Sequence, residues 1–192
     1  MAGSTKLVIV GGANGVGKST VAMQYASECG IPYLGADEIA RRLKAKGTRR
    51  PEIGAGKAFF RELETYLGDR KSVVIESTLA GTGLLNRIDE FRKAGYSVVL
   101  VYVFLGSVGL CRSRIRIRVQ KGGHNVPARD VARRFRRSLS NFWSKYRYVA
   151  DRWQLLYNGG PRPVEVAVEE GGNLAVLDDE YFRVFSNMVE AA

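Results

Sequence analysis

Short apolar runs alternate with longer amphipathic stretches along the chain. The apolar runs are KLVIVGG, IPYL, SVVIES, YSVVLVYVFL and WQLLYN, and most of them are rich in Val, Ile and Leu. Uninterrupted runs of this kind are typical of strands buried on both faces of a parallel sheet. Because helical patterns lie between the runs, the sequence predicts an α/β fold with a mostly parallel sheet of about five strands and helices on both faces.

The amphipathic stretches give the positions of the expected helices. We expect helices over residues 19–29, 36–47, 57–69, 84–95 and 107–120, and a loop for TRRPEIGAG at 48–56. A long helix should begin near Pro127, because proline suits the first turn of a helix. Its apolar positions recur every three or four residues, at Val131, Phe135, Leu139, Phe142, Tyr146 and Val149.

The organisation expected from length and pattern is a single domain over residues 1–192. A chain of 192 residues with 45% hydrophobic residues suits one core. Two helices around the glycine-rich KGGHNVP predict a mobile lid over about 112–137. At the C-terminus, about 162–192, VEVAVEEGGNLAVLD predicts a small β-hairpin turning at Gly171–Gly172, followed by a helix.

The stretch GGANGVGKST contains the pattern G-x-x-x-x-G-K-[S/T] between a predicted strand and a predicted helix. In that context, backbone N–H groups of the loop and the positive end of the helix can hold phosphate, whereas an ordinary glycine-rich turn is the alternative. The pattern predicts a P-loop NTPase fold with ATP and Mg²⁺ as cofactors. Lys18 should reach the β- and γ-phosphates, and the Ser19 hydroxyl should ligate Mg²⁺. The nucleotide-binding residues expected are Gly12, Ala13, Asn14, Gly15, Val16, Gly17, Lys18, Ser19 and Thr20.

Two carboxylates directly follow predicted strands, where parallel sheets place their ligands. Asp37 follows IPYLGA, and Glu76 ends SVVIE. Phosphoryl transfer needs a group that accepts the proton of the attacking hydroxyl, and either carboxylate could do so. The alternatives are that Asp37 only caps a helix and that Glu76 is only hydrogen-bonded at a strand end. The chain has no N-K-x-D motif, which favours a small-molecule kinase over a GTPase.

Basic residues exceed acidic ones, with 30 Lys and Arg against 19 Asp and Glu and a net charge of +11. Arg114 and Arg118 are four residues apart and share a helix face, and Arg133 and Arg134 follow the glycine-rich loop. We expect Arg118 and Arg134 to contact phosphates from the lid, although a solvated basic face is the alternative for each arginine. A nucleic-acid-binding ATPase is a further alternative, but aromatic residues do not interleave with the arginines as a base-stacking surface requires.

Cysteine content and hydropathy predict a cytoplasmic protein. The two cysteines have no partner at metal-ligand spacing, and the N-terminal LVIV is too short for a signal peptide or a membrane span.

Five segments, in chain order, resemble the zeta toxin family of P-loop kinases over roughly residues 7 to 160: GGANGVGKST, GADEIA, IESTLAG, RVQKGGHNVPARDVARRFRRSLSNF and DRWQLLYN. The resemblance implies transfer of the γ-phosphate of ATP to a hydroxyl of a nucleotide sugar, which is UDP-N-acetylglucosamine in the best-known members. By position, it implies that Asp37 activates the sugar hydroxyl, that Glu76 and Thr78 lie near the sugar, and that Arg118 and Arg134 (or Arg133) contact phosphates.

The chain departs from the family pattern beside the expected acceptor pocket. Gly35 stands where Asn is expected, and Lys57 stands where Arg is common. The acceptor therefore stays open, and another metabolite, an antibiotic or a polynucleotide end are alternatives to the nucleotide sugar. The resemblance also admits a small antitoxin protein that covers the ATP site, although no residue of this chain demonstrates one.

Overall fold

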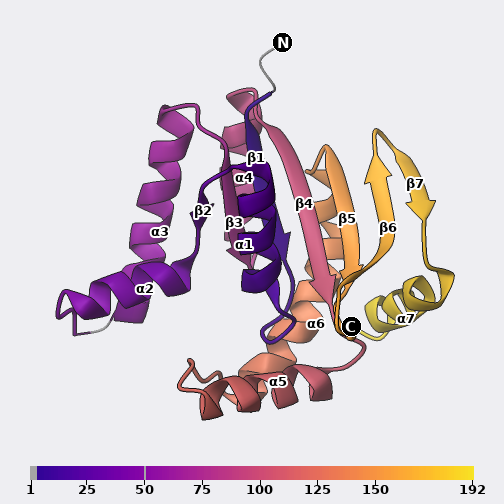
Figure 1. The fold of residues 1–192 in the computed structure, drawn as a ribbon. Helices are drawn as coiled ribbons and strands as arrows, with labels where there is room; N and C mark the ends of the chain where they lie inside the picture. Colours follow the sequence, from indigo (N-terminus) through magenta and orange to yellow (C-terminus); the bar gives the residue numbers. More distant parts are fainter. Residues whose placement is uncertain (1–3, 50) are drawn as a thin grey trace.

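The computed structural model describes residues 4–49 and 51–192, and its centre is a seven-stranded sheet with the order β2-β3-β1-β4-β5-β6-β7 (Figure 1). Five strands run parallel: β1 (Lys6–Gly11), β2 (Tyr33–Leu34), β3 (Val73–Ser77), β4 (Ser97–Phe104) and β5 (Arg152–Tyr157). The predicted hairpin forms as β6 (Val164–Glu170) and β7 (Asn173–Val176), which extend the same sheet in antiparallel fashion. The α/β fold class is confirmed.

Helices cover both faces of this sheet. In Figure 1, α1 lies in front of the strands, whereas α4 and α6 lie behind them, and α5 crosses below the carboxyl ends of the central strands. This arrangement follows from right-handed crossovers, because the chain moves across the sheet in one direction from β1 to β2 and in the opposite direction from β2 onward to β5. The helices are α1 (Lys18–Cys29), α2 (Ala36–Ala45), α3 (Pro51–Gly68), α4 (Gly83–Lys93), α5 (Val108–Gln120), α6 (Ala128–Ser144) and α7 (Asp179–Glu190).

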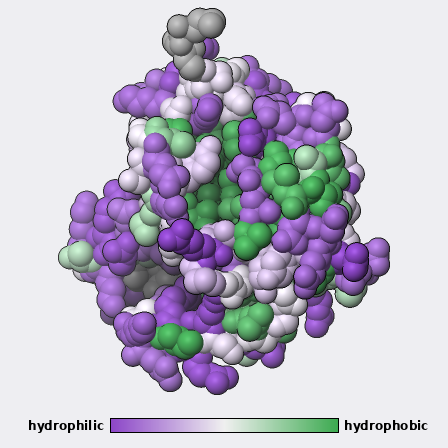
Figure 2. All heavy atoms as spheres, turned by 45° about the vertical axis from the view of Figure 1, so that its right-hand side comes forward, coloured by the Kyte–Doolittle hydropathy of each residue, from purple (hydrophilic) through white to green (hydrophobic). Residues whose placement is uncertain are grey.

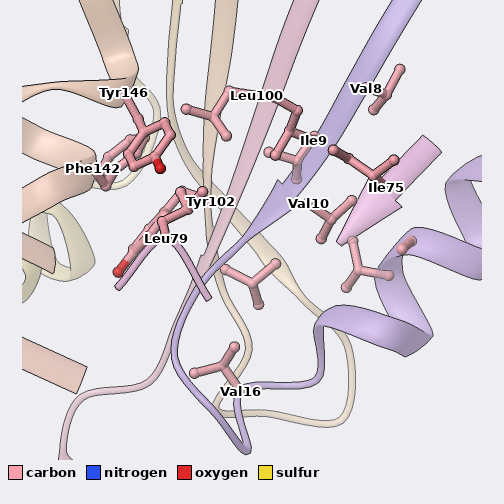
Figure 3. Close-up of a cluster of buried hydrophobic side chains, with 14 of the residues drawn as sticks. Val8, Ile9, Val10, Val16, Ile75, Leu79, Leu100, Tyr102, Phe142 and Tyr146 are labelled. Carbon is pink, nitrogen blue, oxygen red and sulfur yellow. The ribbon is translucent and has the colours of Figure 1, made fainter. Parts of the chain in front are cut away.

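The core explains why the central strands are apolar without alternation. β1 lies between β3 and β4, and its residues Leu7 to Val10 are fully buried. On the α6 side of the sheet, the Tyr102 ring of β4 stacks on Phe142 at a centroid distance of 4.1 Å, with Tyr146 nearby (Figure 3). The buried Tyr102 hydroxyl shares a 2.9 Å hydrogen bond with the Ser138 hydroxyl. Neither hydroxyl is therefore buried without a hydrogen-bond partner.

Three boundaries differ from the sequence prediction. The loop expected at 48–56 is wrong over 51–56, because α3 already begins at Pro51, where proline is tolerated in a first turn; position 50 lies outside the described residues. The long helix expected to reach Val149 ends at Ser144, and a 3₁₀ turn over Tyr146–Tyr148 keeps Tyr146 buried instead. The strand expected at 31–34 is reduced to Tyr33–Leu34, preceded by Pro32, which has no N–H for a ladder.

The C-terminal hairpin forms the edge of the sheet. Leu174, Val176 and Leu177 on and beside β7 are exposed, and Figure 2, which brings this side of the molecule forward, shows apolar surface among mostly hydrophilic surface. Within 4–49 and 51–192, no helix is both long enough and apolar enough to cross a lipid bilayer.

Candidate active site

The glycine-rich loop connects β1 to α1 at the carboxyl edge of the sheet, as the motif predicts. Gly12 has φ +141°, and a Cβ there would overlap the backbone oxygen of Val103. Gly17 ends the loop in the left-handed region at φ +96°, directly before the first turn of α1. These positions need glycine, and they leave the amino end of α1 open to a negatively charged group.

Lys18, the first residue of α1, is buried, with 9% of its surface exposed. Its ammonium donates a 2.9 Å hydrogen bond to the backbone oxygen of Ala13. Burial removes water from the charged form and therefore lowers the pKa of Lys18 below its usual value, although the nearby carboxylates of Glu76 and Asp37 act in the opposite direction. An anion that binds beside this ammonium would replace the lost solvation.

Ser19, Glu76 and Tyr33 form a hydrogen-bonded chain from three different elements. The Ser19 hydroxyl donates to Glu76 Oε2 at 2.8 Å, and the Tyr33 hydroxyl donates to Glu76 Oε1 at 2.8 Å. Burial, followed by the charge of Glu76, raises the pKa of Tyr33, so its hydroxyl keeps its proton. Glu76 thus lies against the P-loop serine.

Asp37 lies in the first turn of α2, and its side chain is exposed. Gly35 occupies the cap position of α2 without any side-chain cap, so Asp37 does not serve as the helix cap. Its carboxylate lines the same cleft as Lys18 and Glu76. Thr78, the first residue after β3, also lines this cleft.

Three arginines reach this cleft from α5 and α6. Arg114 and Arg118 come from α5, and Arg134 comes from α6 and donates to Asn14 of the P-loop at 3.3 Å. Arg118 donates to the backbone oxygen of His124 at 2.6 Å, while its buried Nε has no hydrogen-bond partner among the described groups. Arg133, the alternative to Arg134, instead pairs with Asp130 at 3.0 Å and does not line the cleft.

The cleft that collects these side chains has a volume of about 560 Å³. A second cleft of about 610 Å³ shares Ala36, Asp37 and Arg118 with the first. The second cleft is also lined by Arg41, Lys44 and His124. Lys57, expected beside the acceptor, lines a separate cleft with Phe60 and Arg61.

Two polar residues at strand ends were missed in the sequence. The sequence pattern places Tyr33 in a strand and Asn158 at the end of WQLLYN, and it assigns a functional role to neither. The Asn158 amide donates to the backbone oxygen of Val16 in the P-loop at 2.7 Å. Asn158 directly follows β5, so the rule that polar side chains at the carboxyl ends of parallel strands meet at one edge could have identified it. Tyr33 begins β2, and that rule does not mark it.

The residues present fit a Mg²⁺ ion in its usual protein setting. The described residues contain no cluster of three or more acidic, His or Cys side chains that could hold a metal by themselves. Mg²⁺ in phosphotransferases is bound by one or two protein oxygens together with water and substrate phosphates. The Ser19 hydroxyl and the adjacent Glu76 carboxylate supply such oxygens.

Solved structures with this architecture include proteins that bind or transfer phosphate. AvrRxo1-ORF1 in complex with AvrRxo1-ORF2 and ATP matches at a TM-score of 0.74 with 16% identity, over 96% of this chain and 64% of that one. The PezAT chromosomal toxin–antitoxin system of Streptococcus pneumoniae matches at a TM-score of 0.63 with 14% identity, over 100% of this chain and 88% of that one. A gluconokinase from Sinorhizobium meliloti matches at a TM-score of 0.51 with 17% identity, over 97% of this chain and 92% of that one. These similarities show a P-loop kinase-like fold.

Sequence comparison gives a relative and a family. An uncharacterized protein of Haemophilus influenzae is 27% identical over 128 residues, which make up 67% of this chain and 90% of that protein. The family model described as AAA domain (AAA_33) matches residues 7–142, which span the P-loop, Asp37, Glu76 and the arginines of α5 and α6. With most of its length matched by this model, the chain belongs to that AAA domain family of P-loop proteins.

Proposed function

We propose that the protein is an ATP-dependent phosphotransferase that moves the γ-phosphate of ATP to a hydroxyl group of a small-molecule acceptor. The observation that carries this proposal is the meeting of a P-loop lysine, an exposed aspartate and three arginines in one cleft. Phosphoryl transfer depends on positioning and on charge neutralisation, and these are the groups that supply both.

In the proposed reaction, ATP binds with its phosphates along residues 12–20. Lys18 gives up its bond to Ala13 and contacts the β- and γ-phosphates, which restores the solvation that its ammonium lacks. Asp37 accepts the proton of the acceptor hydroxyl as that oxygen forms its bond to the γ-phosphorus. The bond from phosphorus to the bridging oxygen breaks, and ADP leaves.

Arginines of the segment 112–137 would stabilise the charge that spreads over the transferring group. Arg118 and Arg134 are the proposed contacts, and Arg114 is a third candidate because it lines the same cleft. The unpartnered Nε of Arg118 supports a role in ligand binding, since a buried donor without a partner is costly. We propose that α5, the loop and α6 close as a lid over the nucleotide.

Ser19 and Glu76 are the proposed residues for Mg²⁺. When bound, the ion neutralises phosphate charge and orients the β- and γ-phosphates for transfer. The hydrogen bond between the two side chains supports placing Glu76 on the metal side of the site, and Thr78 then remains the nearer candidate for the acceptor.

The second cleft is the proposed acceptor site. It shares Asp37 with the first cleft, and its basic side chains Arg41 and Lys44 suit an acceptor that itself carries phosphate. A nucleotide sugar such as UDP-N-acetylglucosamine has this chemistry, and the resemblance to zeta toxins supports the same class. Since α2 and the α5–α6 loop form the walls, their residues would select the acceptor.

A small antitoxin protein is a proposed partner. The support is the similarity to AvrRxo1-ORF1 and to PezAT, whose structures are of a two-protein complex and of a toxin–antitoxin system. The partner would block the cleft between the P-loop and α6.

The proposed function is tested by following ADP release with ATP, Mg²⁺ and a panel of nucleotide sugars, and by mass spectrometry of the products. We expect an acceptor-dependent rate and an acceptor that is heavier by one phosphate. Lys18→Ala is the negative control. ADP release that never depends on any phosphorylated acceptor, with inorganic phosphate as the product, would contradict the proposed transferase and indicate an ATPase.

A further inference from the structure

The carboxylate of Glu76 is held at both of its oxygens. Tyr33, the first residue of β2, donates to Oε1 at 2.8 Å, and Ser19 donates to Oε2 at 2.8 Å. With one bond to each oxygen, the carboxylate plane is fixed relative to the P-loop. Ser19 alone could hold only one oxygen, and the group could then rotate.

The residue at position 35 decides whether Tyr33 can reach Glu76. A Cβ on Gly35 would overlap the Tyr33 hydroxyl and would lie 2.7 Å from Cζ and 3.0 Å from Cε1 of the ring. The backbone there is extended, with φ −120° and ψ 134°, which any residue can adopt. The neighbouring Tyr33 ring, and not the backbone conformation, therefore requires a small residue at position 35.

The same contact links the two carboxylates of the site. Gly35 is the cap residue of α2, and Asp37 lies in the first turn of that helix. The Tyr33 ring that holds Glu76 therefore lies against the residue at which the helix carrying Asp37 begins. The glycine that interrupts the family pattern at this position thus matches a structural feature of this chain.

We propose that Tyr33 is a positioning residue that orients Glu76 toward the Mg²⁺ side of the nucleotide site, and that Gly35 provides the space this contact requires. The proposal rests on the proposed function for the presence of MgATP in the cleft. It assigns to Tyr33 a role that no motif of the sequence carries.

Two substitutions should produce the same defect by different routes. Tyr33→Phe removes the hydroxyl and keeps the ring, whereas Gly35→Ala keeps the hydroxyl and displaces it. In each variant Glu76 loses one hydrogen bond, so the gain in ATP affinity on adding Mg²⁺ should fall by about three- to tenfold. Affinity for ATP in EDTA should be unchanged, because Lys18 and the loop backbone are untouched.

The experiment is isothermal titration of ATP into the protein with saturating Mg²⁺ and again with EDTA, for wild type, Tyr33→Phe, Gly35→Ala and the double variant. Tyr148→Phe and Gly56→Ala are matched controls: the first residue is exposed and bonded to Arg147, and a Cβ at the second meets no atom within 4 Å. Thermal unfolding of each variant verifies that it is folded.

We expect the double variant to be no worse than either single variant, because both remove the same contact. Additive losses, or a Tyr33→Phe variant with wild-type Mg²⁺ dependence, would overturn the proposal while leaving the kinase proposal standing. A wild-type protein that binds no ATP with or without Mg²⁺ would overturn the proposed function itself, together with this inference.

Discussion

Replacing the P-loop lysine should make the ligand-free protein more stable while it lowers activity strongly. Lys18 is almost fully buried, and its ammonium carries three donors, of which one is bonded to Ala13 at 2.9 Å. The pKa of Lys18 is lowered by burial even though two carboxylates oppose the change. A lowered pKa means that the folded protein holds this proton less tightly than the unfolded chain does.

The direction of the effect follows from that difference, and its size follows from the general cost of burying a group whose donors are not all hydrogen-bonded. Below both pKa values, the charged lysine costs folding free energy, and Lys18→Met removes the charge while keeping a similar stem. Relieving an incompletely solvated buried charge should stabilise the protein by about 1–3 kcal/mol. For a domain of this size, each kcal/mol raises Tm by about 2–4 °C. Activity should fall by about 10²-fold or more, since a donor to the transferring phosphate is lost.

The pH dependence of stability provides a second test of whether the charged Lys18 destabilises the ligand-free protein. The stability of wild type relative to Lys18→Met should be lowest near neutral pH. It should rise as the pH climbs through the lowered pKa of Lys18 toward the ordinary lysine value of 10.5, because the folded protein releases its proton first. Thermal unfolding without nucleotide, followed by circular dichroism between pH 7 and 9.5, measures this difference. A variant that is less stable than wild type at neutral pH, or a gap independent of pH, would refute the reasoning.

Four further substitutions, one of them with a matched control at Arg133, test single parts of the site. Asp37→Asn should keep ATP affinity and lower transfer by about 10²–10⁴-fold, as measured by calorimetry and ADP release, and near-normal transfer would remove Asp37 as the base. Arg134→Ala should lower kcat by at least about 10³-fold if this arginine acts on the γ-phosphate, whereas the outward-facing Arg133→Ala should not; equal effects would contradict the assignment. Asn158→Ala should weaken ATP binding by about fivefold through loss of the 2.7 Å bond to Val16, and an unchanged dissociation constant would count against that contact. Gly12→Ala should lower Tm and abolish ATP binding, since its Cβ would overlap backbone at φ +141°, and a variant with wild-type Tm would show that the loop can relax.

Hydrophobic pattern was sufficient for the sheet and most helices, because the strands around β1 are buried on both faces and leave an uninterrupted apolar signal. The pattern was misleading where tertiary packing overrides the local preference of the residues. Pro51 and the glycines at 54 and 56 read as a loop, yet they lie in α3, where packing against α2 overrides weak helix propensity. The apolar positions up to Val149 keep helical spacing through the 3₁₀ turn, so periodicity alone could not locate the end of α6.

Some residues of the candidate site could be recognised in the sequence, and others could not. The P-loop residues are recognisable because their spacing is imposed by phosphate geometry. Tyr33 and Asn158 are not, since each acts through one contact with a residue more than forty positions away along the chain. Arg134 contacts the P-loop residue Asn14, whereas Arg133, which the sequence left as an alternative, pairs with Asp130. Phe135 and Phe142 are buried, which supports core packing over a base-stacking surface.

Single-turnover transfer from ATP labelled at the γ-phosphate tests the central claim most directly. Excess protein is mixed with labelled ATP, Mg²⁺ and UDP-N-acetylglucosamine, then with other phosphorylated and unphosphorylated hydroxyl acceptors, and label is followed into the organic product and into inorganic phosphate. The account predicts label in a phosphorylated acceptor with wild type and almost none with Asp37→Asn. Label that appears only in inorganic phosphate, at the same rate in both proteins, would contradict it.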